Sequence, residues 1–391
     1  MGFFISLYDS TEWFFCVGQF SREKGHQRGR RHLRHRGFPL LFRHSPVPPV
    51  PLLSPVPYNS PMRPSPSLLL RHAGVPALLM SDLTAVRYLT GLTLTSGMVL
   101  VLPRSYVLFT DARYREMAEQ ERNDRVGVRD IAELERFLKK IPVCGFEQEN
   151  VTVGRLSRWK IRFPNTKFVR IKDPLEAFRR QKDPEELRLI RRAQRITQEL
   201  LRRVPAALRA GITERGLAWK LQSWARELGA DDLSFPPIVA FGSHASRPHH
   251  QPTTRALQKG HLVQIDVGAI YKGYCADMSR VFFTAKPSPR EEKAFHAVEE
   301  ALGAVIGKVR AGVTTRSLDQ LARSVLRKYG MEENFCHALG HGIGLEVHEG
   351  VTLSSRAPDR TLLKNEVIAV EPGVYFPGKF GIRIEEMLIV E

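Results

Sequence analysis

Residues 261–283 read "HLVQIDVGAIYKGYCADMSRVFF". This stretch decides the fold because it contains two β-like runs, and each run carries one acid. From 263 to 267 apolar residues alternate with polar ones, which is the period of a half-buried strand. A turn over 270–273 leads into a second β-run. The pattern predicts a β-hairpin, and strands that alternate with helical patterns elsewhere in the chain predict a mixed α/β protein.

The two acids of this hairpin are Asp266 and Asp277. If the hairpin is in register about Tyr271 and Lys272, the two carboxylates face each other directly on neighbouring strands. Like charges in that position are destabilising, so the pair requires protonation, a basic partner or a cation. A divalent metal ion is the most economical of these explanations.

The C-terminal stretch "EVIAVEPGVYFPGKFGIRIEEMLIVE", residues 366–391, repeats this arrangement. A β-run ends at Glu371, a proline- and glycine-rich excursion follows, and a further β-run carries Glu385. Pro372 and Pro377 argue against strict pairing next to Glu371, since proline cannot donate to a sheet. A second acidic pair on neighbouring strands is nevertheless predicted.

Between the two pairs lies "CHALGHGIGLEVHE", residues 336–349, with three histidines and three glycines. Each glycine disfavours a helix, so we expect a loop that runs into a short strand. Two histidines seven positions apart could be packed core residues, and each acid alone could be a surface or salt-bridged residue. Taken together, four carboxylates and one imidazole suit Mn²⁺, Co²⁺ or Zn²⁺, and shared carboxylates favour two ions about 3.5–4 Å apart.

The length of 391 residues predicts two domains with additional segments. Residues 1–66 contain a basic run and a proline-studded stretch, which predict a disordered basic and proline-rich extension. Residues 67–178 are expected to form a compact α/β domain. Residues 179–391 are expected to form the second domain, and a charged helix with an Asp-Pro start opens it.

The net charge of +18 favours acidic partners and makes nucleic acid a possibility to weigh. The arginines of the charged helix, however, lack interleaved aromatic or glycine-rich recognition elements, so we interpret them as a solvated helix face and do not expect nucleic-acid binding. The four cysteines are widely spaced, which indicates neither a disulfide framework nor a cysteine zinc site and fits a reducing cytoplasm. No apolar run approaches the roughly 20 residues of a membrane helix.

The motifs "IDVGAIYKGYCADMSR", "HALGHGIGLEVHE", "VEPGVY" and "GIRIEEM" together resemble the metallopeptidases of the pita-bread fold, in the order found in that family. Within the family the chain is similar to the Xaa-Pro aminopeptidase and prolidase branch. The segments "LTAVRYLTG" and "LFTDARYREMA" resemble the smaller creatinase-like N-terminal domain of that branch. The resemblance covers residues from about 67 to the C-terminus and implies a pita-bread catalytic domain preceded by this α/β domain.

Carried over position by position, the resemblance implies five ligands to two divalent ions, which we expect to be Mn²⁺. Two of these ligands, Asp277 and Glu385, are implied to bridge the two ions. It also implies that His249 and His348 are catalytic and bind substrate, and that His337 binds substrate. Arg383, a basic residue of the Xaa-Pro motif, is implied to be catalytic. At position 244 the family commonly has asparagine, and this chain has histidine. The implied ligands are Asp266, Asp277, His341, Glu371 and Glu385.

The activity implied is metal-dependent hydrolysis of Xaa-Pro bonds at a free N-terminus, with Glu371 accepting a proton from the attacking water and passing it to the leaving nitrogen. His348 and His249 would donate to the substrate carbonyl. An Xaa-Pro dipeptidase, a different small amide or N-terminal methionine as substrate, and a non-catalytic binding protein of the same fold are the alternatives. Relatives of this kind are commonly homodimers, so a homodimer is expected.

Overall fold

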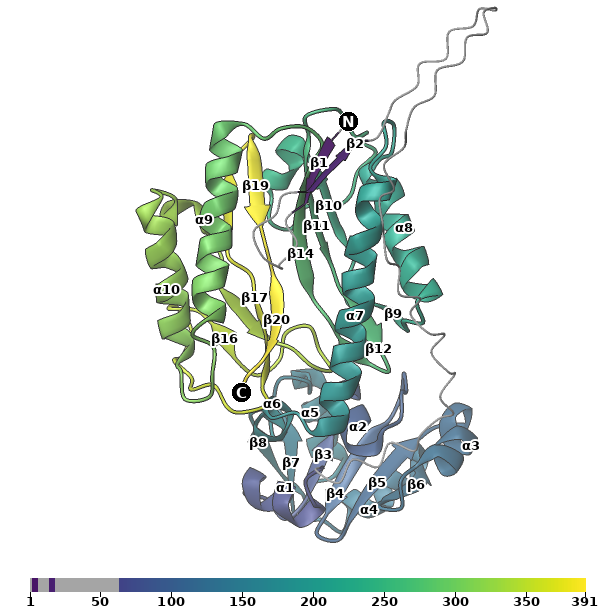
Figure 1. Ribbon diagram of the computed structural model, residues 1–391. Coiled ribbons are helices and arrows are strands. Elements are labelled where there is room, and N and C mark those ends of the chain that lie inside the picture. Colours follow the sequence, from purple (N-terminus) through teal and green to yellow (C-terminus); the bar gives the residue numbers. More distant parts are fainter. Residues whose placement is uncertain (1, 6–13, 18–62) are drawn as a thin grey trace, which may run out of the picture.

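The computed structural model describes residues 2–5, 14–17 and 63–391 (Figure 1). An N-terminal α/β unit packs below a larger unit in which helices flank central strands, and the long helix α7 (Pro184–Ala207) runs beside those strands (Figure 1). The mixed α/β class predicted from the sequence is confirmed. None of the helices in the described residues is long and apolar enough to cross a membrane.

The N-terminal unit is built on one six-stranded sheet in the order β6-β5-β4-β3-β7-β8. Adjacent residues of β3 point to opposite faces: Leu78 belongs to one buried cluster and Leu79 to another, so helices cover both sides. A turn at Pro103 connects β4 and β5. The elements are α1 (Pro66–Ala73), β3 (Leu78–Met80), α2 (Leu83–Thr90), β4 (Met98–Leu102), β5 (Ser105–Thr110), α3 (Ala112–Glu121), β6 (Val126–Asp130), η1 (Ile131–Glu133), α4 (Leu134–Leu138), β7 (Val143–Glu147), α5 (Val153–Arg162), β8 (Lys167–Ile171) and α6 (Glu176–Arg180).

The first half of the larger unit begins with α7, whose Asp-Pro start forms a complete capping box. The Asp183 side chain accepts from the backbone of Glu186, and the Glu186 side chain accepts from the backbone of Asp183. The helix start predicted from the sequence is therefore confirmed. The elements that follow are α8 (Glu214–Glu227), β9 (Asp232–Leu233), β10 (Ile238–Phe241), η2 (Gly242–Ser246), β11 (Leu262–Val267), β12 (Ala269–Tyr271), β13 (Tyr274–Cys275) and β14 (Met278–Phe283).

The hairpin of β11 to β14 forms, but its predicted register is wrong. Lys272 and Gly273 form the turn, with φ of 46° and 78°, because a tight hairpin turn needs positive φ at both central residues and glycine provides it readily. Asp266 therefore pairs with Ser279 and does not face Asp277 directly. A shift of two residues preserves the face of the sheet, so the two acids are diagonal neighbours on one side.

The second half repeats the plan with two helices and a four-stranded sheet in the order β16-β15-β17-β20. The strand β15 contains His341, so the expected loop running into a short strand is confirmed. The elements are α9 (Pro289–Ile306), α10 (Thr315–Lys328), η3 (Glu332–Asn334), β15 (Gly340–Gly342), β16 (Thr352–Leu353), β17 (Val367–Val370), β18 (Gly373–Phe376), β19 (Phe380–Arg383) and β20 (Glu386–Ile389).

The second acidic pair lies at adjacent ends of β17 and β20. Val370 pairs with Glu386, so Glu371 and Glu385 occupy the next position of the same ladder. Glu385 precedes β20 and is not part of a strand, which differs from the expected β-run across it. After Pro372 the chain leaves this sheet and forms the separate β18–β19 hairpin.

Within the predicted N-terminal extension, the structure describes residues 63–66, which lead into α1 and include the buried Arg63, and two short strands, β1 (Gly2–Ile5) and β2 (Phe14–Val17). They pair with each other, and β1 pairs with β14 at Phe283. For these two strands and for residues 63–66 the structure differs from the expected disorder. The rest of the extension up to residue 62 lies outside the described residues, so its disorder remains a prediction.

Candidate active site

A cavity of about 850 Å³ lies between the two halves of the larger unit. The volume falls in the range of about 300–1,000 Å³ that is typical of ligand sites. Glu385 lies beside it, with a carboxylate oxygen within 4.8 Å of ligand-type atoms of Asp277 and His341. The other predicted site residues all line the cavity: His249, Asp266, Asp277, His337, His341, His348, Glu371 and Arg383.

The acids and His341 form a compact cluster. His341 Nε2 lies 3.7 Å from Asp277 Oδ2 and 3.9 Å from Glu371 Oε1. Asp277, His341 and Glu385 are all buried. Sheet pairing brings these side chains together from β11, the start of β14, β15 and the ends of β17 and β20.

Burial gives these groups unusual pKa values. It raises the pKa of Asp277 and Glu385 well above the ordinary range, and the neighbouring carboxylates add to the effect. Burial also raises the pKa of Glu371 to about 8, against the opposing charge of Arg383. Burial and the nearby His348 lower the pKa of His341 to about 4, so this imidazole is neutral at pH 7. Ionised acids this close together repel one another, so the site requires positive charge.

Three buried carboxylate oxygens of the described chain accept no hydrogen bond: Asp266 Oδ1, Asp277 Oδ1 and Glu385 Oε1. A buried polar atom without a partner is costly, and each such atom calls for an explanation. Here the three atoms belong to three of the five implied ligands. A divalent ion would satisfy them together, and oxygen ligands with one neutral imidazole suit Mn²⁺, Co²⁺ or Zn²⁺.

Glycines beside His341 let the backbone of β15 approach its neighbours closely. A Cβ atom on Gly340 would lie 2.0 Å from the carbonyl oxygen of Ala369, and one on Gly342 would lie 2.2 Å from that of Glu349. Neither position has room for any other residue. The glycine-rich motif therefore serves to pack the His341 strand tightly against the strand that leads to Glu371.

Arg383 is the buried cation of the site. Its Nη2 donates to Asp266 Oδ2 at 2.6 Å, and its Nε lies 3.8 Å from Glu371 Oε2. Its Nη1 donates to Tyr375 Oη at 2.6 Å, and its Nε donates to Ser279 Oγ at 2.9 Å. The sequence analysis did not single out Tyr375 or Ser279, although both lie within the quoted motifs.

The three predicted histidines lie on different walls of the cavity. His337 Nε2 lies 3.0 Å from Tyr375 Oη, and burial lowers its pKa to about 4. The ring of His348 packs edge-on against His341, with centroids 4.1 Å apart. Burial also lowers the pKa of His348, and the nearby His249 contributes in the same direction for both His337 and His348. The walls therefore carry imidazoles that face the acid cluster.

The segment that carries His348 is anchored to the connection between the two units. Glu349 is buried, and its carboxylate accepts from Arg179 Nη2 at 2.5 Å and from Lys182 Nζ at 3.0 Å. Burial would raise the pKa of Glu349, but these two cations outweigh burial and lower it. The residue that follows His348 is thereby fixed by two charges from the inter-unit connection.

A second cluster of one acid and two histidines lies behind the wall that carries His249. Glu214, at the start of α8, has His244 Nδ1 at 2.8 Å and His250 Nε2 at 2.9 Å from its carboxylate oxygens. The side chain of Glu214 is fully buried. The sequence analysis missed Glu214, since its local signal is an acid in the first turn of a helix. His244, the departure from the family pattern, belongs to this cluster.

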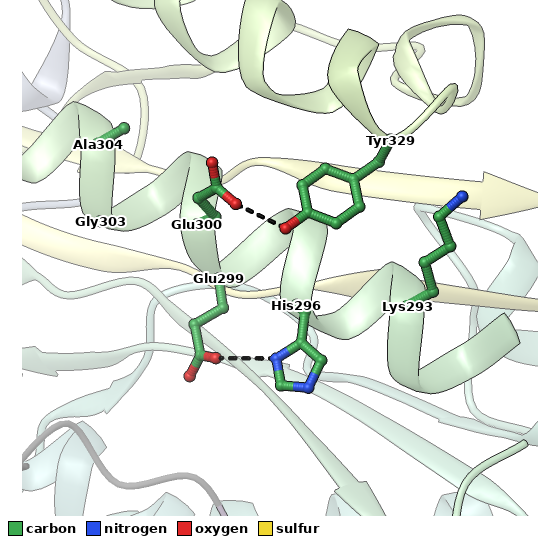
Figure 2. Close-up of a pocket in the computed structure, with 7 residues that line it drawn as sticks. All are labelled: Lys293, His296, Glu299, Glu300, Gly303, Ala304 and Tyr329. Atoms are coloured by element: carbon green, nitrogen blue, oxygen red, sulfur yellow. Dashed lines mark hydrogen bonds and ion pairs between the residues drawn. The ribbon is translucent and has the colours of Figure 1, made fainter. Parts of the chain in front are cut away.

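Another cavity, of about 830 Å³, lies on the surface of α9 and α10 (Figure 2). Four of its polar side chains form two pairs: Tyr329 Oη donates to Glu300 Oε2 at 2.6 Å, and His296 Nδ1 lies 3.7 Å from Glu299 Oε2 (Figure 2). These side chains are partly exposed, and none of the predicted site residues lines this cavity. The candidate active site is therefore the cavity with the acid cluster.

Comparison with known proteins gives matches along both units. Residues 188–391 match metallopeptidase family M24, and residues 68–181 match the creatinase/prolidase N-terminal domain. The chain is 31% identical over 331 residues to an uncharacterized peptidase, YqhT, of Bacillus subtilis, covering 82% of this chain and 93% of that one. It is 30% identical to the Xaa-Pro dipeptidase of Pyrococcus horikoshii, covering 81% and 90%.

Among solved structures, the X-Pro aminopeptidase from Thermotoga maritima is similar, with 35% identity, a TM-score of 0.77 and coverage of 82% of this chain and 94% of that one. The Xaa-Pro dipeptidase from Bacillus anthracis matches with 31% identity, a TM-score of 0.79 and coverage of 82% and 92%. The family match, the buried acid cluster and the predicted motifs agree. The chain is a peptidase of metallopeptidase family M24, with a creatinase/prolidase N-terminal domain in front of a pita-bread catalytic domain.

Proposed function

We propose that this protein is an Xaa-Pro aminopeptidase that hydrolyses Xaa-Pro bonds at the free N-terminus of peptides. It uses two divalent ions, and we expect these to be Mn²⁺. The observation that carries the proposal is the set of three buried carboxylate oxygens without hydrogen-bond partners beside a substrate-sized cavity. The names of similar proteins, X-Pro aminopeptidase and Xaa-Pro dipeptidase, support the substrate class.

The proposed ligands are the five residues implied by the family resemblance, with Asp277 and Glu385 shared between the ions. Asp277 and Glu385 would suit that role because each has one buried oxygen without a hydrogen-bond partner, whereas the second oxygen of Asp266 already accepts from Arg383. Divalent ions held there would supply a water that loses its proton near neutral pH. Co²⁺ and Zn²⁺ fit the same donors. The full set is Asp266, Asp277, His341, Glu371 and Glu385.

The remaining steps fall to side chains of the cavity. Glu371, the most exposed of the cluster's acids, would be ionised beside bound divalent ions. It accepts a proton from the attacking water and delivers it to the proline nitrogen. His348 and His249 donate to the substrate carbonyl, a contribution of about 3–4 kcal/mol for one such donor. His337, fixed by Tyr375, contacts the bound peptide. Arg383 holds Asp266 and Glu371 in place and balances their charge.

Support for substrates longer than a dipeptide comes from the lining of the cavity. Its lining residues lie between 235 and 383, in the larger unit. No residue of the N-terminal unit, as far as the structure describes it, lines the cavity, which favours room for the carboxyl end of a longer peptide. The alternative is an Xaa-Pro dipeptidase, as two of the similar proteins are named. In a homodimer, which we also propose, a second chain could narrow the cavity.

The test is a hydrolysis assay with added Mn²⁺ on Ala-Pro, Ala-Pro-Phe and Ala-Ala-Phe. We expect cleavage of Ala-Pro-Phe at its first bond and little or no cleavage of Ala-Ala-Phe. Activity confined to Ala-Pro would make the protein a dipeptidase. Equal rates on Ala-Pro-Phe and Ala-Ala-Phe would refute selectivity for proline. The Asp277→Asn variant serves as the control for contaminating peptidases.

A further inference from the structure

The carboxylate of Glu214 accepts five hydrogen bonds, all from one loop. Its Oε1 accepts from the backbone N–H of Phe241 at 2.9 Å and from His244 Nδ1 at 2.8 Å. Its Oε2 accepts from His250 Nε2 at 2.9 Å, and from the backbone N–H and the hydroxyl of Thr253 at 2.9 and 2.6 Å. One buried side chain thus fastens the loop 241–253 at its beginning, middle and end.

His249 lies inside this loop, and both of its neighbours in the chain are held. On one side the carbonyl oxygen of Pro248 accepts from Arg383 Nη1 at 3.3 Å, and the same guanidinium pairs with Asp266. On the other side the ring of His250 is buried against Glu214. His249 is therefore fixed between the acid cluster and the start of α8.

We propose that Glu214 is a positioning residue that acts through His250 to hold His249 toward the reacting carbonyl. This inference rests on the proposed function, in which His249 donates to the substrate. Residues that orient the groups touching a reaction centre typically affect metal affinity or activity by about 10–100-fold when they are replaced. Glu214 itself does not line the cavity, so its effect must pass through the loop.

The bonding pattern identifies this cluster as an anchor. An ionised carboxylate only accepts hydrogen bonds, so His250 Nε2 and His244 Nδ1 must carry their protons, and a protonated ring nitrogen cannot bind a metal. Burial opposes ionisation of Glu214, but the hydrogen bonds from Thr253, His250 and Phe241 outweigh it and lower the pKa of Glu214 to about 2. The carboxylate is therefore ionised and fully occupied.

The first experiment is a double-mutant cycle on Ala-Pro-Phe hydrolysis. Glu214→Gln and His250→Ala should each lower kcat by about 10–100-fold, with smaller changes in KM and unchanged metal content. In the His249→Ala background the same changes should lower kcat by less than about threefold, because the group that they position is already gone. Multiplicative losses in the double variants would overturn the inference. His250→Gln, which keeps a donor toward Glu214, should restore part of the rate.

The matched control is Glu147→Gln in the N-terminal unit. Glu147 is also a buried carboxylate that accepts backbone N–H groups, from Ser81 and Asp82. This change should leave kcat unaltered even if it lowers stability. A fall in kcat equal to that of Glu214→Gln would mean that loss of any buried carboxylate has the same effect, and the inference would be wrong.

A measurement without activity separates this inference from the proposed function. The ring C–H signals of His249, assigned with the His249→Ala variant, should shift in the NMR spectrum of metal-free Glu214→Gln and stay unchanged in Glu147→Gln. Unshifted His249 signals would overturn the positioning role. The proposed function fails independently if the wild-type protein with Mn²⁺ cleaves no Xaa-Pro peptide.

Discussion

Two clusters in the larger unit contain the same kinds of groups and differ in what those groups bond. One cluster contains Asp277, His341 and Glu385, and the other contains Glu214, His244 and His250. In each cluster, one ring nitrogen or carboxylate oxygen from every residue lies within 4.8 Å of those from the other two. In the first cluster two carboxylate oxygens lack partners and the acids have raised pKa values. In the second the acid has five donors and a pKa lowered to about 2. The two clusters have similar distances between their groups. What distinguishes an ion site from a structural anchor is whether the carboxylate oxygens already accept hydrogen bonds.

The difference follows from where the acids lie. Glu371 and Glu385 lie at the ends of paired strands, and Asp277 directly precedes β14, so nearby backbone N–H groups are already used in sheet pairing. Glu214 lies at the start of a helix and faces a loop, where N–H groups still require acceptors. Strand ends therefore leave acids unsatisfied, and a helix start beside a loop satisfies one completely.

The strongest test of this comparison is Asp277→Asn. Loss of a carboxylate proposed to be shared by both ions should abolish metal binding and activity, while the fold survives because the amide has the same shape. Elemental analysis and the Ala-Pro-Phe assay measure the two effects. Two metal equivalents with intact activity in this variant would show that the unsatisfied oxygens do not hold ions.

His348→Ala should lower kcat by about 10²–10³-fold and leave the metal content unchanged, because the proposed role is donation to the transition state. Steady-state kinetics and elemental analysis on the same preparation distinguish the two effects. Loss of a metal equivalent would instead make His348 a ligand and would enlarge the first cluster.

Removal of metal should destabilise the protein because ions leave the first cluster. The second cluster should not contribute to this loss of stability. At an ion concentration about 100–1,000 times Kd, bound metal contributes about 2.7–4.1 kcal/mol, so a chelator should lower Tm by several degrees. Thermal unfolding of Glu214→Gln with and without chelator should show the same decrease. If Glu214→Gln removes the response to chelator, the second cluster binds metal and the comparison fails.

The smallest expected effect concerns acid stability. The pKa of Glu214 is lowered from 4.5 to about 2, so its stabilisation is fully present above about pH 5 and is lost as the pH falls toward 2. Between pH 5 and 3.5 this should cost about 1 kcal/mol. Denaturant unfolding at both pH values should show that loss in the wild type and a smaller loss in Glu214→Gln. Equal losses would mean that Glu214 is not the titrating group.

The sequence predicted the site better than it predicted local register. The family resemblance of motifs spread over residues 249–385 implied one shared site. The structure gathers these residues at one cavity because sheet pairing places the strands that carry them side by side. The register failed because an alternating pattern fits pairings shifted by two residues equally well, and only turn geometry distinguishes them. The role of Glu214 could not be predicted because its hydrogen-bond partners lie 27 to 39 positions further along the chain and no sequence pattern links them to it.

The anchoring of Glu349 by Arg179 and Lys182 has a consequence for the modularity of this architecture. Two cations supplied by the inter-unit connection restrain the residue next to His348, so under the proposed mechanism the boundary between the units supports a catalytic residue. Recombination or engineering that exchanges the N-terminal unit must retain this connection with the catalytic unit. A chimaera joined a few residues downstream would inherit a buried, uncompensated acid beside the histidine that we propose to donate to the substrate.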